Sequence, residues 1–260
     1  MKLNLQGKKA LITGASKGIG EATARVLAAE GCSLHLAARN GAAMRDLQQA
    51  LIAEYGVSVS VYEKDLSSQA AMESLAAEVG AIDILINNAG DIPAGTLDLV
   101  DDQAWRAGFD LKVFGYISLC RLYYPQMKAA NQGVIINVIG NSGENWDASY
   151  IAGSTGNAAL MSFTKALGGR SLDDGIRVIG INPGPVATDR MLKIMKRKAI
   201  DMLGDEARWE ELFARYPGKR PATSEEVADL VAFMVSERAG YISGTNITID
   251  GGIAARGSVI

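Results

Sequence analysis

The chain has 260 residues, of which 48% are hydrophobic, and its formal net charge is −3. This length suits one large domain with a substantial core. The basic residues are scattered rather than clustered, so the sequence shows no electrostatic footprint for nucleic acid. No apolar run approaches the roughly 20 residues that span a bilayer, and the N-terminus has no apolar signal segment. We therefore expect a cytoplasmic protein without a nucleic-acid or membrane partner.

The residues that usually bind metals or form disulfides are few. Cys32 and Cys120 are too far apart to form a CxxC pair, and we interpret both as buried small hydrophobic residues. The single histidine, His35, lies inside an apolar run. Zinc sites need several such ligands, so no metal site is expected.

Short apolar runs alternate along the chain with segments of helical periodicity. The runs are rich in Val and Ile and are bounded by Gly, Asp or Asn, which is typical of strands. Strands that alternate with helices at this spacing predict βαβ units and an α/β fold with a parallel, doubly wound sheet. We expect strands at residues 8–14, 33–38, 57–62, 82–87, 133–138, 176–181 and 245–249.

Residues 188–217 interrupt this alternation, between the sixth predicted strand and a capping box. In that box Thr223 and Glu226 can each satisfy a backbone donor at the start of a helix. The apolar residues of the interrupting segment recur at helical spacings: Met191, Met195, Met202, Trp209, Phe213 and Tyr216. We expect an inserted helical lid that moves over a medium-sized, largely apolar substrate. No stretch has the composition of a linker, so residues 1–260 are expected to form a single domain.

The most specific motif follows the first predicted strand. The stretch LITGASKGIGEATA places Gly14, Gly18 and Gly20 between that strand and an amphipathic helix. Glycines in this position let the backbone approach a pyrophosphate, whose charge is met by free N–H groups and by the dipole at the helix N-terminus. The strand–turn–helix context therefore predicts a dinucleotide-binding site.

Further motifs follow in an order that resembles the short-chain dehydrogenase/reductase family. They are TGASKGIG at 13–20, Asp65-Leu66 after the third strand, NNAG at 87–90, INPGPVATD at 181–189 and SGTNITIDGG at 243–252. The resemblance covers nearly the whole chain. It implies a Rossmann-type sheet of about seven parallel strands and an oxidoreductase that acts on the carbonyl or alcohol group of a small molecule.

The resemblance also implies a binding role for individual residues. The pyrophosphate and the adjoining ribose would be held by Gly14, Ser16, Gly18, Ile19 and Gly20. The adenosine would lie among Asp65, Leu66, Asn87, Ala89 and Gly90. The nicotinamide would be held by Pro183, Gly184, Val186 and Thr188.

Charge at the end of the second strand predicts which nicotinamide cofactor is used. NAD-selective proteins of this fold end that strand with an acid that bonds the ribose 2′-OH. Here Ala38 stands at that place, Arg39 follows it, and Lys17 in the glycine loop adds a second cation. A 2′-phosphate suits a planar guanidinium, so we expect NADP(H) to be preferred over NAD(H).

In the family that the chain resembles, a tyrosine protonates the alkoxide formed by hydride transfer to a carbonyl, and a nearby lysine lowers the phenol pKa. A serine bonds the substrate oxygen, and an asparagine in the preceding long helix completes a water relay. Counting from the flanking motifs places other residues at all four positions. They are Gly140 for serine, Gly153 for tyrosine, Asn157 for lysine and Lys112 for asparagine.

We expect this acid/base apparatus to have moved rather than disappeared. Lys112 would enter the space left by the shorter Asn157, whose amide would still bond the nicotinamide ribose. Tyr150, three residues before Gly153, would lie close to the same helix face and is the nearest phenol. Ser142 would take over the bond to the substrate oxygen. The expected catalytic residues are therefore Lys112, Tyr150 and Ser142.

Two other functions remain open. The protein could bind NADP as a sensor without redox turnover, or it could be a lyase or hydratase that uses the same cleft. We favour the oxidoreductase because a pure binding module would not need the nicotinamide-side segment at 183–188. The resemblance also implies a homotetramer, with a dimer as the second choice, through apolar helical faces at 119–127 and 158–168.

Overall fold

The computed structural model describes residues 2–256, except for the side chains of residues 190, 193 and 194. Within these residues, one sheet of seven parallel strands has the order β3-β2-β1-β4-β5-β6-β7. The strands are β1 (Lys9–Thr13), β2 (Ser33–Ala38), β3 (Val59–Glu63), β4 (Ile84–Asn87), β5 (Gly133–Val138), β6 (Ile176–Pro183) and β7 (Thr245–Ile249). The predicted single-domain, doubly wound α/β fold is confirmed. β6 continues two residues beyond its predicted end because its pairing with β7 extends to Pro183 and Ile249.

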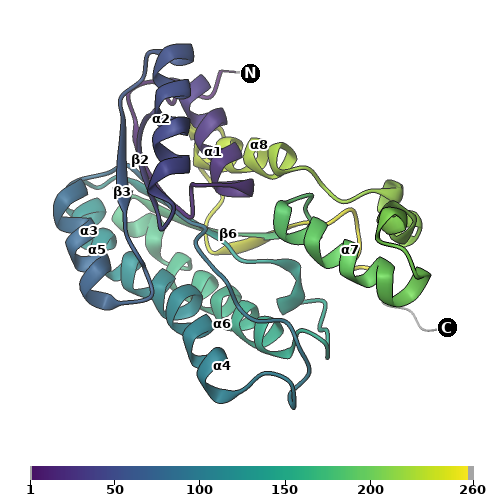
Figure 1. The fold of residues 1–260 in the computed structure, drawn as a ribbon. Helices are drawn as coiled ribbons and strands as arrows, with labels where there is room; N and C mark the ends of the chain where they lie inside the picture. The colour runs from purple at the N-terminus through teal and green to yellow at the C-terminus, as the bar shows by residue number, and fades with distance from the viewer. Residues whose placement is uncertain (1, 257–260) are drawn as a thin grey trace.

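Helices cover both faces of the sheet (Figure 1). One layer consists of α1 (Gly18–Ala29), α2 (Gly41–Tyr55) and α8 (Ser224–Val235), and the other of α3 (Gln69–Val79), α5 (Gly115–Ala129) and α6 (Ile151–Gly168). Within β1, Ala10 and Ile12 pack into the core under the first layer, while Leu11 between them packs under the second. Successive strand residues point to opposite faces, so a strand covered on both sides is apolar throughout.

The predicted capping box begins α8. The backbone N–H of Glu226 donates to Thr223 Oγ1 at 3.2 Å, and the backbone N–H of Thr223 donates to Glu226 Oε2 at 2.8 Å. Two backbone donors that the helix itself leaves without an acceptor are thereby satisfied. The start of this helix is therefore set by local sequence.

The long helix that carries Lys112 contains an irregular turn. α4 (Asp102–Phe109) runs into a π-helical turn at Asp110–Phe114, which continues as α5. Such a turn widens the helix locally and is frequently found at functional sites. Lys112 lies at its centre, which the 3.6-residue periodicity of the sequence did not indicate.

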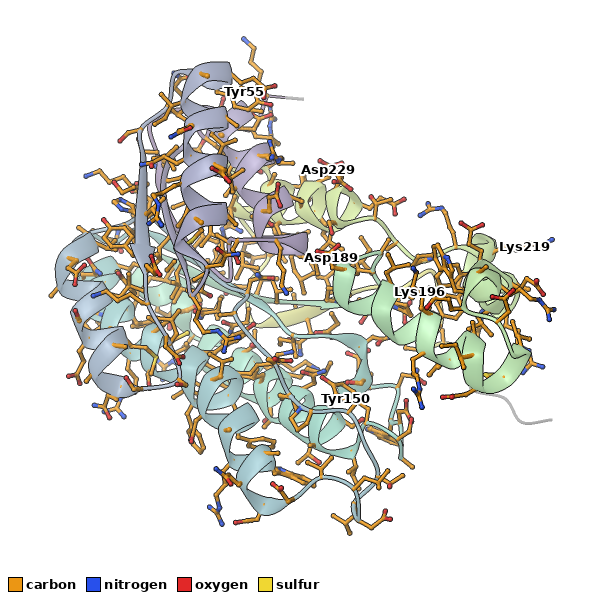
Figure 2. All side chains as sticks on the ribbon, viewed as in Figure 1. Tyr55, Tyr150, Asp189, Lys196, Lys219 and Asp229 are labelled. Carbon is orange, nitrogen blue, oxygen red and sulfur yellow. The ribbon has the colours of Figure 1, made fainter. Side chains whose placement is uncertain are left out.

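The predicted insertion at 188–217 is helical. α7 (Asp189–Leu203) extends outward from the sheet (Figure 1), with Asp189 at its start and Lys196 near its middle (Figure 2). A 3-10 segment at Glu206–Arg215 packs against α7. Within this segment, the ring of Phe213 meets that of Trp209 edge-on, with ring centroids 5.5 Å apart. Met195 is buried in this pair, but Met202 is 67% exposed. The apolar residues of the segment therefore do not form one packed face.

The described residues contain neither a cluster of metal ligands nor a membrane-spanning helix, and both cysteines are buried. Over residues 2–256 the structure brings together no group of side chains able to hold a metal ion, and none of its helices is long and apolar enough to cross a membrane. Cys32 and Cys120 are buried as predicted. Burial raises the pKa of each thiol to about 12, so neither forms a reactive thiolate near neutral pH.

Arg177 in β6 ties the sheet to the end of α8. Its guanidinium is buried and donates to the carbonyl oxygens of Met234, Val235 and Ser236, at 2.5, 3.1 and 3.0 Å. Burial lowers the Arg177 pKa. We expect Arg177→Met to lower the free energy of unfolding by about 2–4 kcal/mol, because several buried carbonyls lose their donor. Urea unfolding would measure this, with the exposed Arg170→Met as a control that changes it by less than about 0.5 kcal/mol.

Candidate cofactor and catalytic site

A cavity of about 850 Å³ opens where the carboxyl ends of β1 to β4 meet the start of α7. The strand order reverses between β1 and β4, and nucleotides bind at this point in doubly wound sheets. Many of the residues predicted to bind the cofactor line this cavity together. They are Gly14, Ser16, Lys17, Gly18, Ile19, Arg39, Asp65, Leu66, Ala89, Gly90 and Thr188.

The three glycines of the loop lie where a side chain would collide with neighbouring parts of the protein. Gly14 has a φ of +66°, and a Cβ on it would come within 2.9 Å of Asn88 Nδ2. A Cβ on Gly18, whose φ is +58°, would come within 3.2 Å of the Thr188 methyl group. A Cβ on Gly20 would overlap the carbonyl oxygen of Gly14, so this third glycine lets α1 pack against the loop. The three glycines thus have the roles that a dinucleotide fold requires.

Asn88 is a cavity residue that sequence reasoning missed. Its side-chain amide donates to the carbonyl oxygens of Thr13 and Gly14, at 3.0 and 3.3 Å, and its backbone N–H donates to Thr13 Oγ1. These bonds hold the glycine loop against the end of β4. The signal was present, since Asn88 is the second asparagine of NNAG. Other lining residues that were not predicted include Lys64, Asp91 and Leu192. The lining also includes three residues of the predicted lid segment, namely Met191, Trp209 and Phe213.

Several residues assigned to the cofactor do not line the cavity. Asn87 is fully buried, and its amide donates to Asn137 Oδ1 at 2.9 Å, so it ties β4 to β5 inside the sheet. Asn157 also lies outside the lining. The remaining residues of this kind are Gly20, Pro183, Gly184 and Val186. Ala187 and Asp189 line the cavity beside Thr188.

Two cations lie at the end of the cavity formed by the glycine loop and β2. Lys17 and Arg39 are exposed and line it, and neither has an ion pair or side-chain hydrogen bond within residues 2–256. Ala38, at the end of β2, places no acid there. Free cations at this point match a 2′-phosphate on the adenosine ribose. Together with the glycine loop, they fit an NADP(H) molecule.

Lys112 points inward from the π-helical turn. Its Nζ donates to the carbonyl oxygen of Ile139, just beyond β5, at 2.5 Å. Its aliphatic stem lies over Gly90, where a Cβ would come within 2.8 Å of Lys112 Cδ. Since Gly90 lines the cavity, this stem forms part of the support behind the cavity wall. Lys112 therefore ends within the protein rather than at the surface.

Tyr150 lies in the space that Gly153 leaves open. A Cβ on Gly153 would overlap the phenol ring of Tyr150. The expected helical spacing between the two is wrong, because Tyr150 is the N-cap of α6, with a φ of −140°, and precedes the helix. Its ring nevertheless reaches the face of α6 that carries Gly153. Tyr150, labelled in Figure 2, is not among the residues that line the cavity, and neither are Lys112 and Ser142.

Ser142 and Asn157 are bonded to each other. Ser142 belongs to a short 3-10 turn at Asn141–Gly143, and Asn157 lies in α6, where it is only 2% exposed. Asn157 Nδ2 donates to Ser142 Oγ at 2.7 Å. A Cβ on Gly140 would come within 2.9 Å of the same nitrogen. The Asn157 amide therefore fills the space beside Gly140. Lys112 donates to the carbonyl oxygen of Ile139, the residue before Gly140.

Residues 8–199 match the model of a protein family described as short chain dehydrogenase. The match covers most of the chain. The protein belongs to the short-chain dehydrogenase/reductase family.

Individual members of this family resemble the chain over nearly its full length. The NADPH-dependent reductase BacG of Bacillus subtilis (strain 168) is 34% identical, over 94% of this chain and 97% of that protein. The 3-oxoacyl-[acyl-carrier-protein] reductase FabG of Escherichia coli (strain K12) is 32% identical, over 96% and 99%. The crystal structure of L-sorbose reductase from Gluconobacter frateurii with NADPH and L-sorbose superimposes with a TM-score of 0.90, at 33% identity over 98% of this chain and 99% of that one.

Membership of the short-chain dehydrogenase/reductase family confirms the predicted enzyme class, an oxidoreductase. The predicted cofactor, NADP(H), is also confirmed by relatives whose names or structures contain NADPH. The unpaired Lys17 and Arg39 at the cavity agree with this cofactor.

Proposed function

We propose that this protein is an NADPH-dependent reductase whose acid/base apparatus is formed by Lys112, Tyr150 and Ser142. Its substrate is the carbonyl group of a small, largely apolar molecule. The observation that carries the proposal is the overlap between the Tyr150 ring and the side-chain space of Gly153. The Tyr150 phenol therefore lies beside Gly153, the helix position expected for the family's tyrosine, although it comes from a different residue.

The cavity supports an apolar substrate. Met191, Leu192, Trp209 and Phe213 line it from α7 and the 3-10 segment that follows. Met191 and Leu192 follow Thr188 by three and four residues, at the predicted nicotinamide end. Apolar side chains there would exclude water from the reacting carbonyl and adapt to its substituents. We propose that residues 188–217 move as a lid over the bound substrate.

When bound, NADPH supplies the hydride for carbonyl reduction. The substrate oxygen then needs a proton, which the Tyr150 phenol would donate. The Lys112 ammonium, held at the Ile139 carbonyl, would stabilise the phenolate that remains. Ser142 would donate a hydrogen bond to the same substrate oxygen. A positioned general acid contributes about 10²–10⁴ to the rate, so a relocated one would preserve efficient reduction.

Turnover of purified protein with NADPH and a panel of carbonyl compounds tests this function. The nicotinamide absorbance is expected to fall on addition of a bulky, apolar ketone or aldehyde. Binding of NADPH without oxidation by any carbonyl compound would favour the sensor instead. Conversion of the substrate without a change in nicotinamide absorbance would favour a lyase or hydratase.

The charges at the cavity predict the cofactor preference. We expect Arg39→Asp to weaken NADPH binding by about 10–100-fold, since one charge-assisted hydrogen bond is worth about 1.5–3 kcal/mol. NADH should bind the variant as well as or better than the unmodified protein, because the new carboxylate can accept from the ribose 2′-OH. Fluorescence titration with both nucleotides measures this, with Arg45→Asp on the neighbouring helix as the charge control. Tighter binding of NADH than NADPH to the unmodified protein would contradict the assignment.

We propose a homotetramer, with a dimer as the second choice, and a cytoplasmic location. The apolar residues of 119–127 and 158–168 largely serve this chain's own core, where Leu119, Tyr123 and Leu160 are buried. Those left partly exposed are Leu122, Tyr124, Phe163 and Leu167. Phe114, in the π-helical turn, is 54% exposed. Light scattering at micromolar concentration is expected to give the mass of four chains, and a monomeric mass would refute both assemblies.

A further inference from the structure

Asn157 and Ser142 form a pair whose direction of hydrogen bonding matters for catalysis. Asn157 Nδ2 is the donor and Ser142 Oγ is the acceptor, at 2.7 Å. A serine hydroxyl has a single proton, and accepting this bond leaves that proton free to be donated elsewhere. The pair therefore makes Ser142 available as a donor, which is the role that a carbonyl reductase needs beside the substrate oxygen.

The reverse orientation of the amide would be less favourable. In the observed orientation Asn157 Oδ1 is buried and has no hydrogen-bond partner within residues 2–256. If the amide were turned over, Oδ1 would accept the Ser142 proton. The NH₂ group would then be buried without the Ser142 oxygen as an acceptor for either of its protons. Each buried unsatisfied group costs about 1–3 kcal/mol, so fewer of them is favoured.

Gly140 makes the pair possible. Its φ is +125°, a conformation that side chains rarely adopt, and a Cβ there would come within 2.9 Å of Asn157 Nδ2. Any side chain at this position would push the amide away from Ser142. Gly140 stands at the expected serine position and Asn157 at the expected lysine position. These two changes therefore belong to one rearrangement, in which the serine hydroxyl comes from residue 142 instead of residue 140.

We propose that Asn157 is a positioning residue that presents the Ser142 hydroxyl as a hydrogen-bond donor to the substrate oxygen. This inference rests on the proposed role of Ser142 in carbonyl reduction. It assigns Asn157 an action on the substrate through Ser142.

Asn157→Asp tests the direction of the bond, because a carboxylate of the same size can only accept. It would take the Ser142 proton. We expect kcat and kcat/KM for carbonyl reduction to fall together by about 10²–10³-fold, as for Ser142→Ala, since each variant removes a donor at the developing oxyanion. Asn157→Leu neither donates nor accepts, leaves the Ser142 proton free, and is expected to lose only about 2–10-fold. The exposed Asn145→Asp, in the same loop, is the matched control and should retain activity.

The double variant Ser142→Ala/Asn157→Asp separates positioning from a general structural role. If Asn157 acts through Ser142, the double variant is no slower than Ser142→Ala alone. Multiplied losses would overturn the inference, as would equal rates for Asn157→Asp and Asn157→Leu. Thermal melting of each variant identifies any loss of folding. If Asn157→Asp does not fold, the reduction rates of Asn157→Leu and Ser142→Ala are compared instead. A loss of rate for Asn157→Leu as large as that for Ser142→Ala would overturn the inference. Full activity of Ser142→Ala would instead refute the proposed role of Ser142 itself.

Discussion

Replacing Tyr150 with phenylalanine is expected to lower kcat/KM for carbonyl reduction by about 10²–10⁴-fold, the contribution of one positioned general acid. Phenylalanine keeps the ring that fills the space over Gly153, so the packing of α6 is retained. Affinity for NADPH should stay within about threefold, because residues elsewhere line the cofactor cavity. Stopped-flow and steady-state rates measure the loss. Tyr241→Phe, at a 95% exposed residue, is the control and should leave the rate unchanged.

Gly153→Ala tests the same contact from the helix side. The new methyl group would overlap the Tyr150 ring, so the phenol must move and the reduction rate is expected to fall. In a Tyr150→Ala background the overlap is gone. There Gly153→Ala should raise the free energy of unfolding by about 1 kcal/mol, since alanine is the better residue inside a helix. Equal effects of Gly153→Ala in both backgrounds would show that the ring does not occupy this space.

Lys112→Met is expected to lower kcat by about 10²–10³-fold, because the charge that stabilises the phenolate is removed. Methionine retains most of the apolar stem that packs over Gly90. The Ile139 carbonyl loses its donor, which should also lower the free energy of unfolding by about 1–3 kcal/mol. Rates and urea unfolding measured on one preparation separate the two effects. Lys165→Met, on the exposed side of α6, is the control.

Lys112→Arg distinguishes how the cation acts. A guanidinium keeps the positive charge but does not lose its proton at accessible pH. Retained turnover would mean that Lys112 acts as a fixed charge beside Tyr150, as proposed, and a loss as large as that of Lys112→Met would mean that the lysine itself transfers the proton. Normal turnover of both Lys112→Met and Tyr150→Phe would refute the relocated apparatus.

The fold and the nucleotide end of the site could be predicted because their signals are local. Each strand is a short apolar run, and burial on both faces of a parallel sheet requires such a run. The glycine loop needs a positive φ at Gly14 and Gly18, which only glycine adopts easily. Arg39 follows β2 directly, so its place at the cavity depends on one strand end. In each case a few consecutive residues contain the whole physical requirement.

The insertion was predicted in position but not in packing. Helical spacing predicted α7, and the structure adds a cap at its start, where the Met191 N–H donates to Thr188 Oγ1. The same spacing did not distinguish buried Met195 from exposed Met202. That difference depends on how the 206–215 segment packs against α7, which is a contact between two elements rather than a feature of either one alone.

By itself, the sequence determined the sheet, the glycine loop and the cofactor preference. The tertiary structure alone decided that Lys112 reaches the Ile139 carbonyl, that the Tyr150 ring covers Gly153, and that Asn157 donates to Ser142. The reason is physical. A backbone conformation follows from neighbouring residues, whereas the direction of a side chain near the end of β5 depends on packing and hydrogen bonds from several elements at once.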